Sequence, residues 1–318
     1  MSKRLLIKSV VTKIDRPTAS VTFLHFAPVH RSQFPLYKAG AHTVVRLHDG
    51  MMRPYSLCGD PPQSEWRIAV HGRNTPGSVS HRITNDIAEG DYLYLSYPQE
   101  KFGLAVTAAR HRFIAGGIGI TPILAMLYAL HHDSSIVTPR LHYFARSRSD
   151  CLFLDELEQL NVDVHLHYST DQGRPDVRDV ANEPESGEHL YYCGPPTMME
   201  ALDQTAHAWR GRVHSEGFTA KQGLGLGSWG SDFEVALTNA GRRISVGSDE
   251  TTLQALLKAG IRIDYACEGG ICGTCVVDVD VDNPADVDHR DHCLTEQERT
   301  TTMAPCVSRG RGTIRLRL

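Results

Sequence analysis

A stretch near the end of the chain reads Cys267-Glu268-Gly269-Gly270-Ile271-Cys272-Gly273-Thr274-Cys275. Its cysteines are spaced C-x4-C-x2-C, with glycines that let a backbone turn closely around a bound group and direct N–H groups at it. The last sixth of the chain also holds Cys293 and Cys306, whereas Cys58, Cys151 and Cys193 are scattered singly. Clustered cysteines in a long chain are more often metal ligands than disulfide partners. The stretch therefore predicts a metal-binding loop.

Cys306 is the candidate fourth ligand. It follows Cys275 by about thirty residues, and C-x4-C-x2-C with a distant fourth cysteine is the ligand spacing of plant-type [2Fe–2S] clusters. The segment Ala304-Pro305-Cys306 resembles the last ligand segment of such ferredoxins, whereas Cys293 precedes a Thr-x-x-Glu pattern typical of a helix start. The alternative is a zinc site, which would usually show two Cys-x-x-Cys pairs, and only Cys272 and Cys275 form one here.

Length and composition indicate a globular protein of two or three domains. The chain has 318 residues, of which 41% are hydrophobic and 22% charged, with a formal net charge of -4. This charge argues against a nucleic acid or an anionic membrane as partner. There is no apolar run of about 18 residues, and the charged N-terminus lacks the apolar stretch of a secretory signal. We expect a cytoplasmic, monomeric protein with no nucleic-acid or membrane partner.

The rhythm of apolar residues divides the chain. Residues 1–105 contain short alternating runs broken by proline and glycine, as at 20–26, 43–47 and 66–70, which predicts an antiparallel β-barrel. In residues 106–222, predicted strands alternate with helices, the last helix covering 196–209. This alternation indicates a doubly wound parallel α/β sheet. Residues 223–232 are Gly-rich and are interpreted as a linker, followed by a third domain over 233–318.

Two segments of the first domain suit a flavin. Arg53-Pro54-Tyr55-Ser56-Leu57 follows a predicted barrel strand. A flavin ring needs a flat aromatic neighbour, a donor near N5 and a cation for its phosphate, and Tyr55, Ser56 and Arg53 offer one each. Further on, Gly77 and Ser78 begin a predicted helix whose N-terminal amides would hold a phosphate.

The second domain carries features of a nicotinamide site. Gly116-Gly117-Ile118-Gly119-Ile120-Thr121-Pro122 lies between a predicted strand and a helix; it is not a G-x-G-x-x-G, yet its glycines permit close approach of a pyrophosphate. Cys193-Gly194-Pro195 follows the last apolar strand, where the thiol is placed to abut the nicotinamide ring. Arg146 and Arg148 suit the 2′-phosphate of NADPH, whereas the 2′-hydroxyl of NADH prefers a carboxylate, for which Asp150 and Asp171 are the nearest candidates.

With these motifs in this order, the chain resembles the phthalate dioxygenase reductase family, and within it the vanillate O-demethylase reductases. The resemblance covers essentially the whole length. It implies a flavin barrel, a nicotinamide domain and a C-terminal β-grasp ferredoxin domain. It also implies FMN rather than FAD, NADH as donor, and a Rieske-type non-haem iron oxygenase that accepts single electrons.

The same resemblance extends to two shorter segments. His214-Ser215-Glu216-Gly217-Phe218 is similar to the end of the family's nicotinamide domain, which implies that Phe218 lies beside the flavin. Gln99-Glu100-Lys101-Phe102 departs from the Arg-Asn that relatives usually carry before the Phe, so no flavin contact is inferred there.

The sequence thus predicts an NAD(P)H-dependent flavin and iron–sulfur oxidoreductase. The expected catalytic residues are Ser56, Thr121 and Cys193, and the expected cluster ligands are Cys267, Cys272, Cys275 and Cys306. The expected cofactor-binding residues are Arg53, Pro54, Tyr55, Ser56, Leu57, Gly77, Ser78, Gly116, Gly117, Gly119, Thr121, Pro122, Arg146, Cys193, Gly194, Pro195 and Phe218. Two alternatives remain open: another acceptor, such as a di-iron monooxygenase or a haem protein, and a zinc-stapled protein without redox activity.

Overall fold

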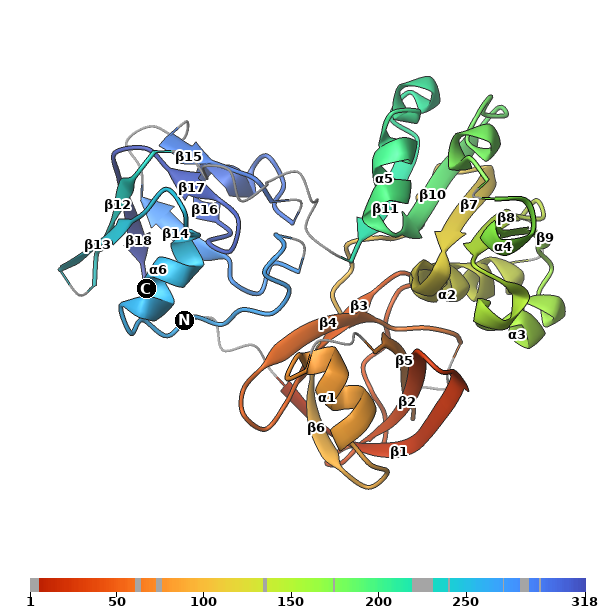
Figure 1. Cartoon of the computed structure of the whole chain (residues 1–318), viewed down its shortest axis with the longest axis horizontal. Coiled ribbons are helices and arrows are strands. Elements are labelled where there is room, and N and C mark those ends of the chain that lie inside the picture. Colours follow the sequence, from red (N-terminus) through yellow and green to blue (C-terminus); the bar gives the residue numbers. More distant parts are fainter. Residues whose placement is uncertain are drawn as a thin grey trace. The chain divides into compact units, whose positions relative to one another are not determined.

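The computed structural model describes residues 6–60, 64–72, 76–133, 136–173, 175–218, 231–239, 241–270, 272–280, 286–291 and 293–318. These residues belong to two compact units, one ending at Phe218 and the other including everything from Ser231 onward (Figure 1). The predicted Gly-rich linker at 223–232 lies outside the described residues, except for Ser231 and Asp232.

The first unit begins with an antiparallel barrel. Its strands follow the order β4-β3-β6-β1-β2-β5, and a bridge between Leu57 and Ile68 joins the end of β4 to β5. Trp66 is buried in the barrel core and stacks on Phe34 with ring centroids 4.1 Å apart. The strands are β1 (Leu6–Thr18), β2 (Val21–Pro28), β3 (His42–Arg46), β4 (Met52–Ser56), β5 (Trp66–His71) and β6 (Tyr92–Ser96), with helix α1 (Val79–Asp86) between β5 and β6 in the chain.

A five-stranded parallel sheet follows in the same unit. It comprises β7 (Arg110–Gly116), β8 (Arg140–Ala145), β9 (Asp163–Tyr168), β10 (Glu188–Gly194) and β11 (Val213–Gly217), in the order β11-β10-β7-β8-β9. The order in which strands are added to the sheet reverses between β7 and β10. Strands β8 and β9 lie on one side of β7, and β10 and β11 lie on the other. Ligands of open α/β sheets bind at such a switch point, beyond the carboxyl ends of the strands. Here those ends are Gly116 and Gly194.

Helix α2 (Ile120–His131) connects the sheet with the barrel. Its residues from Ile120 to Leu127 are all buried, as expected of a helix that is apolar on every side. One apolar core contains residues of α2, of the sheet and of the barrel strands, among them Phe23, which stacks on Phe153 at 4.6 Å. Arg67 of β5 also makes two 2.8 Å hydrogen bonds to Glu156 of α3 (Leu154–Gln159). Barrel and sheet therefore share packing and charge contacts.

The predicted helix over 196–209 is wrong in its second half. Helix α5 spans Pro196–Asp203, and a separate 3-10 turn covers Ala206–Trp209. The Thr205 hydroxyl donates to the carbonyl of Leu202 at 2.8 Å, a local bond that competes with helix continuation. The Trp209 indole is buried and donates to the carbonyl of Ala181 at 2.8 Å. The buried contacts of Trp209 thus hold this segment in a conformation other than the predicted helix.

The second unit has the predicted β-grasp fold. Its mixed sheet has the order β13-β12-β18-β14-β16, with β12 and β18 parallel. Helix α6 (Thr252–Lys258) packs on β13 and begins with a capping box between Thr251 and Gln254. The strands are β12 (Phe233–Leu237), β13 (Arg242–Val246), β14 (Val277–Asp280), β16 (Thr302–Met303) and β18 (Thr313–Arg317), beside the small pair β15 (Val287–Asp288) and β17 (Arg309–Gly310). Among the described residues, no helix is long and apolar enough to cross a membrane.

Candidate redox sites

The predicted flavin segment lies on β4, where it meets the end of the α/β sheet. Pairing of β3 with β4 sets Ser56 opposite His42. The Ser56 hydroxyl donates to the carboxylate of Glu216, on β11, at 3.5 Å. The other carboxylate oxygen of Glu216 lies 3.8 Å from Nδ1 of His42. Three buried polar side chains from distant parts of the sequence therefore meet at one point.

Burial determines the charge of this group. Glu216 is only 6% exposed, and desolvation raises its pKa to about 8, against a smaller opposing effect of the Ser56 hydrogen bond. Cys193 lies beside Glu216 in the β10–β11 register and is fully buried. Burial, and secondarily the Glu216 carboxylate, raises the pKa of the Cys193 thiol well above its usual value. At neutral pH both groups are thus mainly protonated.

The residues predicted to bind the flavin phosphate lie at the N-terminus of α1 and on β4. Ser78 is the N-cap of α1, and its hydroxyl accepts a hydrogen bond from the amide of His81 at 3.2 Å. Gly77, just before it, has a φ of 78°, a conformation that glycine adopts without strain. Helix α1 packs against β4, which carries Arg53. A helix N-terminus near an arginine suits a phosphate.

The glycine turn after β7 packs directly against the end of β10. A Cβ on Gly119 would lie 2.1 Å from the carbonyl oxygen of Cys193, and one on Gly116 would lie 2.6 Å from Cδ of Pro195. The predicted nicotinamide segments 116–122 and 193–195 therefore meet with no room for side chains between them. Thr121 is 2% exposed, and its hydroxyl donates to the carbonyl of Ile118 at 3.0 Å, which fixes the turn.

The residues predicted near the adenosine and beside the flavin are more exposed. Arg146 follows β8 and is exposed, while Arg148 forms an exposed 3.8 Å ion pair with Glu158. The carboxylate of Asp150 accepts a 2.6 Å hydrogen bond from Ser147. Phe218, two residues beyond Glu216, is 38% exposed.

The four predicted cluster cysteines form two contacting pairs in the second unit. Cys272 lies beside Cys267, and Cys306 lies beside Cys275. The amides of Gly269 and Cys272 both donate to the Cys267 sulfur at 3.4 Å. Two pairs of thiols with backbone donors match a donor set that gives two cysteines to each of two irons. Among the described residues, no group of three or more His, Cys, Asp or Glu side chains is arranged so that it could hold one metal ion.

The loop that carries the first three cysteines depends on its glycines. Gly270 has a φ of 70°, and a Cβ there would lie 2.6 Å from the side chain of Val307, next to Cys306. Gly270 thus allows the loop to approach the Cys306 segment. Cys293 is buried nearby and lies 3.8 Å from a carboxylate oxygen of Asp291. Its thiol is in neither of the two pairs.

Comparisons with known proteins agree with this geometry. Residues 235–309 match the family described as 2Fe-2S iron-sulfur cluster binding domain, and residues 113–204 match the oxidoreductase NAD-binding domain. The phthalate 4,5-dioxygenase oxygenase reductase subunit of Pseudomonas putida is 37% identical over 88% of this chain and 86% of its own length. The vanillate O-demethylase oxidoreductase of Acinetobacter baylyi is 33% identical over 96% of both chains.

The chain belongs to the phthalate dioxygenase reductase family. The solved structure of phthalate dioxygenase reductase superposes with a TM-score of 0.72 at 28% identity and covers 98% of both chains. The protein is an NAD(P)H-dependent flavin and iron–sulfur oxidoreductase, an electron-transfer reductase with a [2Fe–2S] domain. This membership excludes the zinc-stapled alternative.

Two further similarities concern haem proteins. The heme-dependent oxidative N-demethylase beta subunit of Ectopseudomonas mendocina is 36% identical over 88% of this chain and 89% of its own length. An intact type IV self-sufficient cytochrome P450 monooxygenase superposes with a TM-score of 0.82 at 32% identity. The superposition covers 98% of this chain but only 41% of the longer cytochrome P450 chain.

Sequence reasoning missed His42 as a residue of the reductase's flavin segment. Its signal is the Asp49-Gly50 dipeptide, which is typical of a tight hairpin turn between β3 and β4. The turn spans the three residues 48–50, so Leu47 faces Met51 and His42 faces Ser56. The position of Glu216 had no comparable local signal, because β11 reaches the site only through the sheet order.

Proposed function

We propose that this chain is the reductase component of a Rieske-type non-haem iron oxygenase, using NADH, FMN and its [2Fe–2S] cluster. The observation that carries the proposal is the contact between Ser56 and Glu216, with Cys193 alongside. It supports the proposal because it brings the segment predicted to bind flavin to the edge of the sheet predicted to bind nicotinamide. When bound, the flavin accepts two electrons as a hydride and releases them one at a time.

In this proposal, residues of the chain bind and orient the flavin and the nicotinamide nucleotide. Arg53 and the N-terminus of α1 hold the flavin phosphate, while Pro54, Tyr55 and Leu57 support the ring. Ser56, whose hydroxyl is bonded to Glu216, would lie near N5, and Phe218 would cover the ring. The Gly116–Thr121 turn holds the pyrophosphate, and Pro122, Gly194 and Pro195 shape its surroundings. Cys193 and Thr121 position the nicotinamide, and the buried Cys193–Glu216 contact excludes water.

Cofactor choice follows the relatives. The similarity to phthalate dioxygenase reductase supports FMN, and family membership supports NADH as donor. Arg146, exposed beyond β8, is the residue that would contact the adenosine ribose, and it retains some affinity for a 2′-phosphate. Cys267, Cys272, Cys275 and Cys306 would hold the cluster through which single electrons leave.

The decisive experiment combines spectroscopy with reconstitution. Flavin released from the purified reductase is identified by chromatography, and absorbance is followed during anaerobic titration with NADH and then NADPH. The reductase is then mixed with a Rieske oxygenase component encoded beside it, and substrate turnover is measured. FMN, bleaching by NADH and coupled turnover are expected. FAD, or failure to support any Rieske oxygenase, would overturn the corresponding part of the proposal.

A haem protein is the second candidate acceptor. The similarity to the beta subunit of a heme-dependent oxidative N-demethylase favours it, because that match extends over most of both chains. A parallel reconstitution with a neighbouring haem-protein component distinguishes the two acceptors. Turnover only with the haem protein would replace the Rieske partner and leave the electron path within this chain unchanged.

A further inference from the structure

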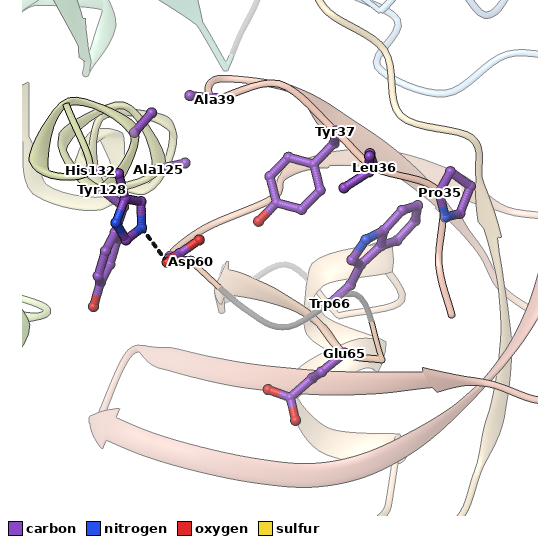
Figure 2. A pocket seen from close by; sticks show the side chains of 12 residues that line it. Pro35, Leu36, Tyr37, Ala39, Asp60, Glu65, Trp66, Ala125, Tyr128 and His132 are labelled. Atoms are coloured by element: carbon purple, nitrogen blue, oxygen red, sulfur yellow. Dashed lines mark hydrogen bonds and ion pairs between the residues drawn. The ribbon is translucent and has the colours of Figure 1, made fainter. Parts of the chain in front are cut away.

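A pocket of about 230 Å³ lies in the first unit, between the barrel and helix α2 (Figure 2). One wall comes from the barrel, by residues 35–37, Ala39 and Trp66, and the other from the side of α2 between Ala125 and His132. None of the residues predicted for flavin, nicotinamide or cluster binding lines it. This pocket is therefore separate from the redox sites.

The barrel wall offers a rigid aromatic surface. Trp66 is only 1% exposed and is held by its 4.1 Å stacking on Phe34. The ring of Tyr37 meets Trp66 edge to face, with centroids 6.2 Å apart. Aromatic faces of this kind attract both apolar groups and cations.

The charged residues that line the pocket are acidic. Two carboxylates, Asp60 and Glu65, border the pocket, and the described lining residues include no lysine or arginine. Asp60 lies 2.7 Å from Nε2 of His132, across the pocket mouth, and Glu65 lies 2.7 Å from Nδ1 of His25. The pocket therefore has negative groups and aromatic faces but no permanent cation of its own.

The hydroxyl of Tyr37 lacks a hydrogen-bond partner. Its oxygen is buried and has no partner among the described residues. Figure 2 shows it pointing to the side of the pocket where Asp60 lies. Burial, and to a lesser degree the Asp60 carboxylate, raises the pKa of Tyr37 against a smaller opposing effect of Arg67, so this hydroxyl stays protonated and can accept from a ligand N–H. Buried polar groups are normally paired, so the position favours a ligand with a donor.

We propose that this pocket binds a small primary ammonium ion with a short apolar chain. Its N–H groups would bond the Tyr37 oxygen and the Asp60 carboxylate, and its chain would lie against Leu36 and the ring of Tyr37. The volume corresponds to roughly seven or eight liquid water molecules, which suits such a ligand and is smaller than most drug-sized sites. Because both barrel and α2 line the pocket, the ligand would contact both and stabilise their association.

The test uses the flavin- and cluster-loaded reductase with three probes of equal chain length. n-Butylammonium, n-butanol and butyrate are titrated by calorimetry, in parallel with the thermal midpoint. The ammonium ion is expected to bind at least about tenfold more tightly than the alcohol, and butyrate not at all. Equal affinity for ammonium and alcohol, or no binding of ammonium up to tens of millimolar, would overturn the proposal.

Variants locate the binding. Tyr37→Phe and Asp60→Asn should each weaken butylammonium binding about tenfold or more. Ala129→Phe, an exposed position on the α2 wall, should fill the pocket and abolish binding even if Asp60→Asn proves unstable. Glu100→Gln is the control, since its carboxylate pairs with Lys38 on the barrel surface. Undiminished binding in Ala129→Phe, or loss in Glu100→Gln, would show that the cation binds elsewhere.

Discussion

The hydroxyl of Ser56 and the carboxylate of Glu216 are joined by a 3.5 Å hydrogen bond, although 160 residues separate them in the chain. Ser56 ends β4 of the barrel, and Glu216 lies near the end of β11. Both side chains are buried. The contact joins the predicted flavin segment to the strand beside Cys193, so a change at either residue tests the arrangement on which the proposed hydride transfer depends.

The raised pKa of Glu216 predicts a pH-dependent stability. Its folded value of about 8 exceeds the ordinary 4.5, so the folded protein keeps a proton that the unfolded chain loses between these values. The contribution is full below pH 4.5 and falls as pH rises toward 8, by about 1.4 kcal/mol per unit. Glu216→Gln should remove this decline and stabilise the protein relative to wild type at pH 8.5 but not at pH 5. Urea titrations at the two pH values measure it, and equal pH slopes would contradict it.

Cys272→Ser should separate the two halves of the electron path. Removing one sulfur of the Cys267–Cys272 pair leaves an incomplete ligand set, so NADH-driven reduction of cytochrome c should fall about a hundredfold or more. Reduction of ferricyanide, which accepts electrons from the flavin, should remain within about twofold of wild type. Cys293→Ser, beside the cluster loop but outside both pairs, is the control and should retain both activities. Loss of both activities in Cys272→Ser would show that the cluster is not a separate downstream station.

Arg53→Ala should weaken flavin retention. Loss of a charge-assisted phosphate contact costs about 1.5–3 kcal/mol, which corresponds to a roughly tenfold to hundredfold higher dissociation constant. Flavin fluorescence on dilution measures the release. Arg31→Ala, an exposed arginine next to Tyr97, serves as the matched control. Full flavin occupancy of Arg53→Ala after dilution would rule out the phosphate role.

Gly119→Ala should impair nucleotide binding. The added Cβ would lie 2.1 Å from the Cys193 carbonyl oxygen, so the glycine turn must move away from β10. We expect KM for NADH to rise about tenfold or more and the thermal midpoint to fall by several degrees. Gly103→Ala, whose Cβ would meet no atom within 4 Å, should change neither. An unchanged KM in Gly119→Ala would mean that the turn does not contact the pyrophosphate.

Arg146→Ala should sharpen the preference for NADH. If the guanidinium contacts a 2′-phosphate, its loss lowers kcat/KM for NADPH about fivefold or more and changes that for NADH by less than about twofold. Steady-state rates with both nucleotides give the ratio. An equal loss with the two nucleotides would assign Arg146 to a part that they share.

Elements bounded by local signals could be predicted from the sequence. The strand over 140–145 has the predicted bounds, and the helix predicted over 252–259 begins at Thr252 behind its capping box and ends one residue early. The prediction of a helix to Trp209 was wrong, because burial of the Trp209 indole overrides local helix preference. The spacing of apolar residues indicates the secondary structure of a segment. It does not show which distant residue a side chain of that segment contacts.

The cysteine spacing was sufficient to predict the [2Fe–2S] domain, and the ligand set it suggests stays a prediction, with three of the four cysteines in one short loop. The group around Ser56 could not be derived in the same way. Glu216 reaches it only because β11 lies beside β10 in the sheet order β11-β10-β7-β8-β9. The pocket between the barrel and α2 is a similar case, since its walls come from three separate stretches of the chain. Such sites arise from topology and have no local pattern.

The two cysteine pairs of the second unit differ in their connection along the chain. Cys267 and Cys272 belong to one short loop, whereas Cys275 reaches its partner only after β14, β15 and β16 have formed between them. A cut or local unfolding in that intervening stretch would detach Cys306 and leave the first pair intact. Damage to this unit should therefore separate Cys306 first, and the integrity of the C-terminal strands would control how long the four cysteines stay together.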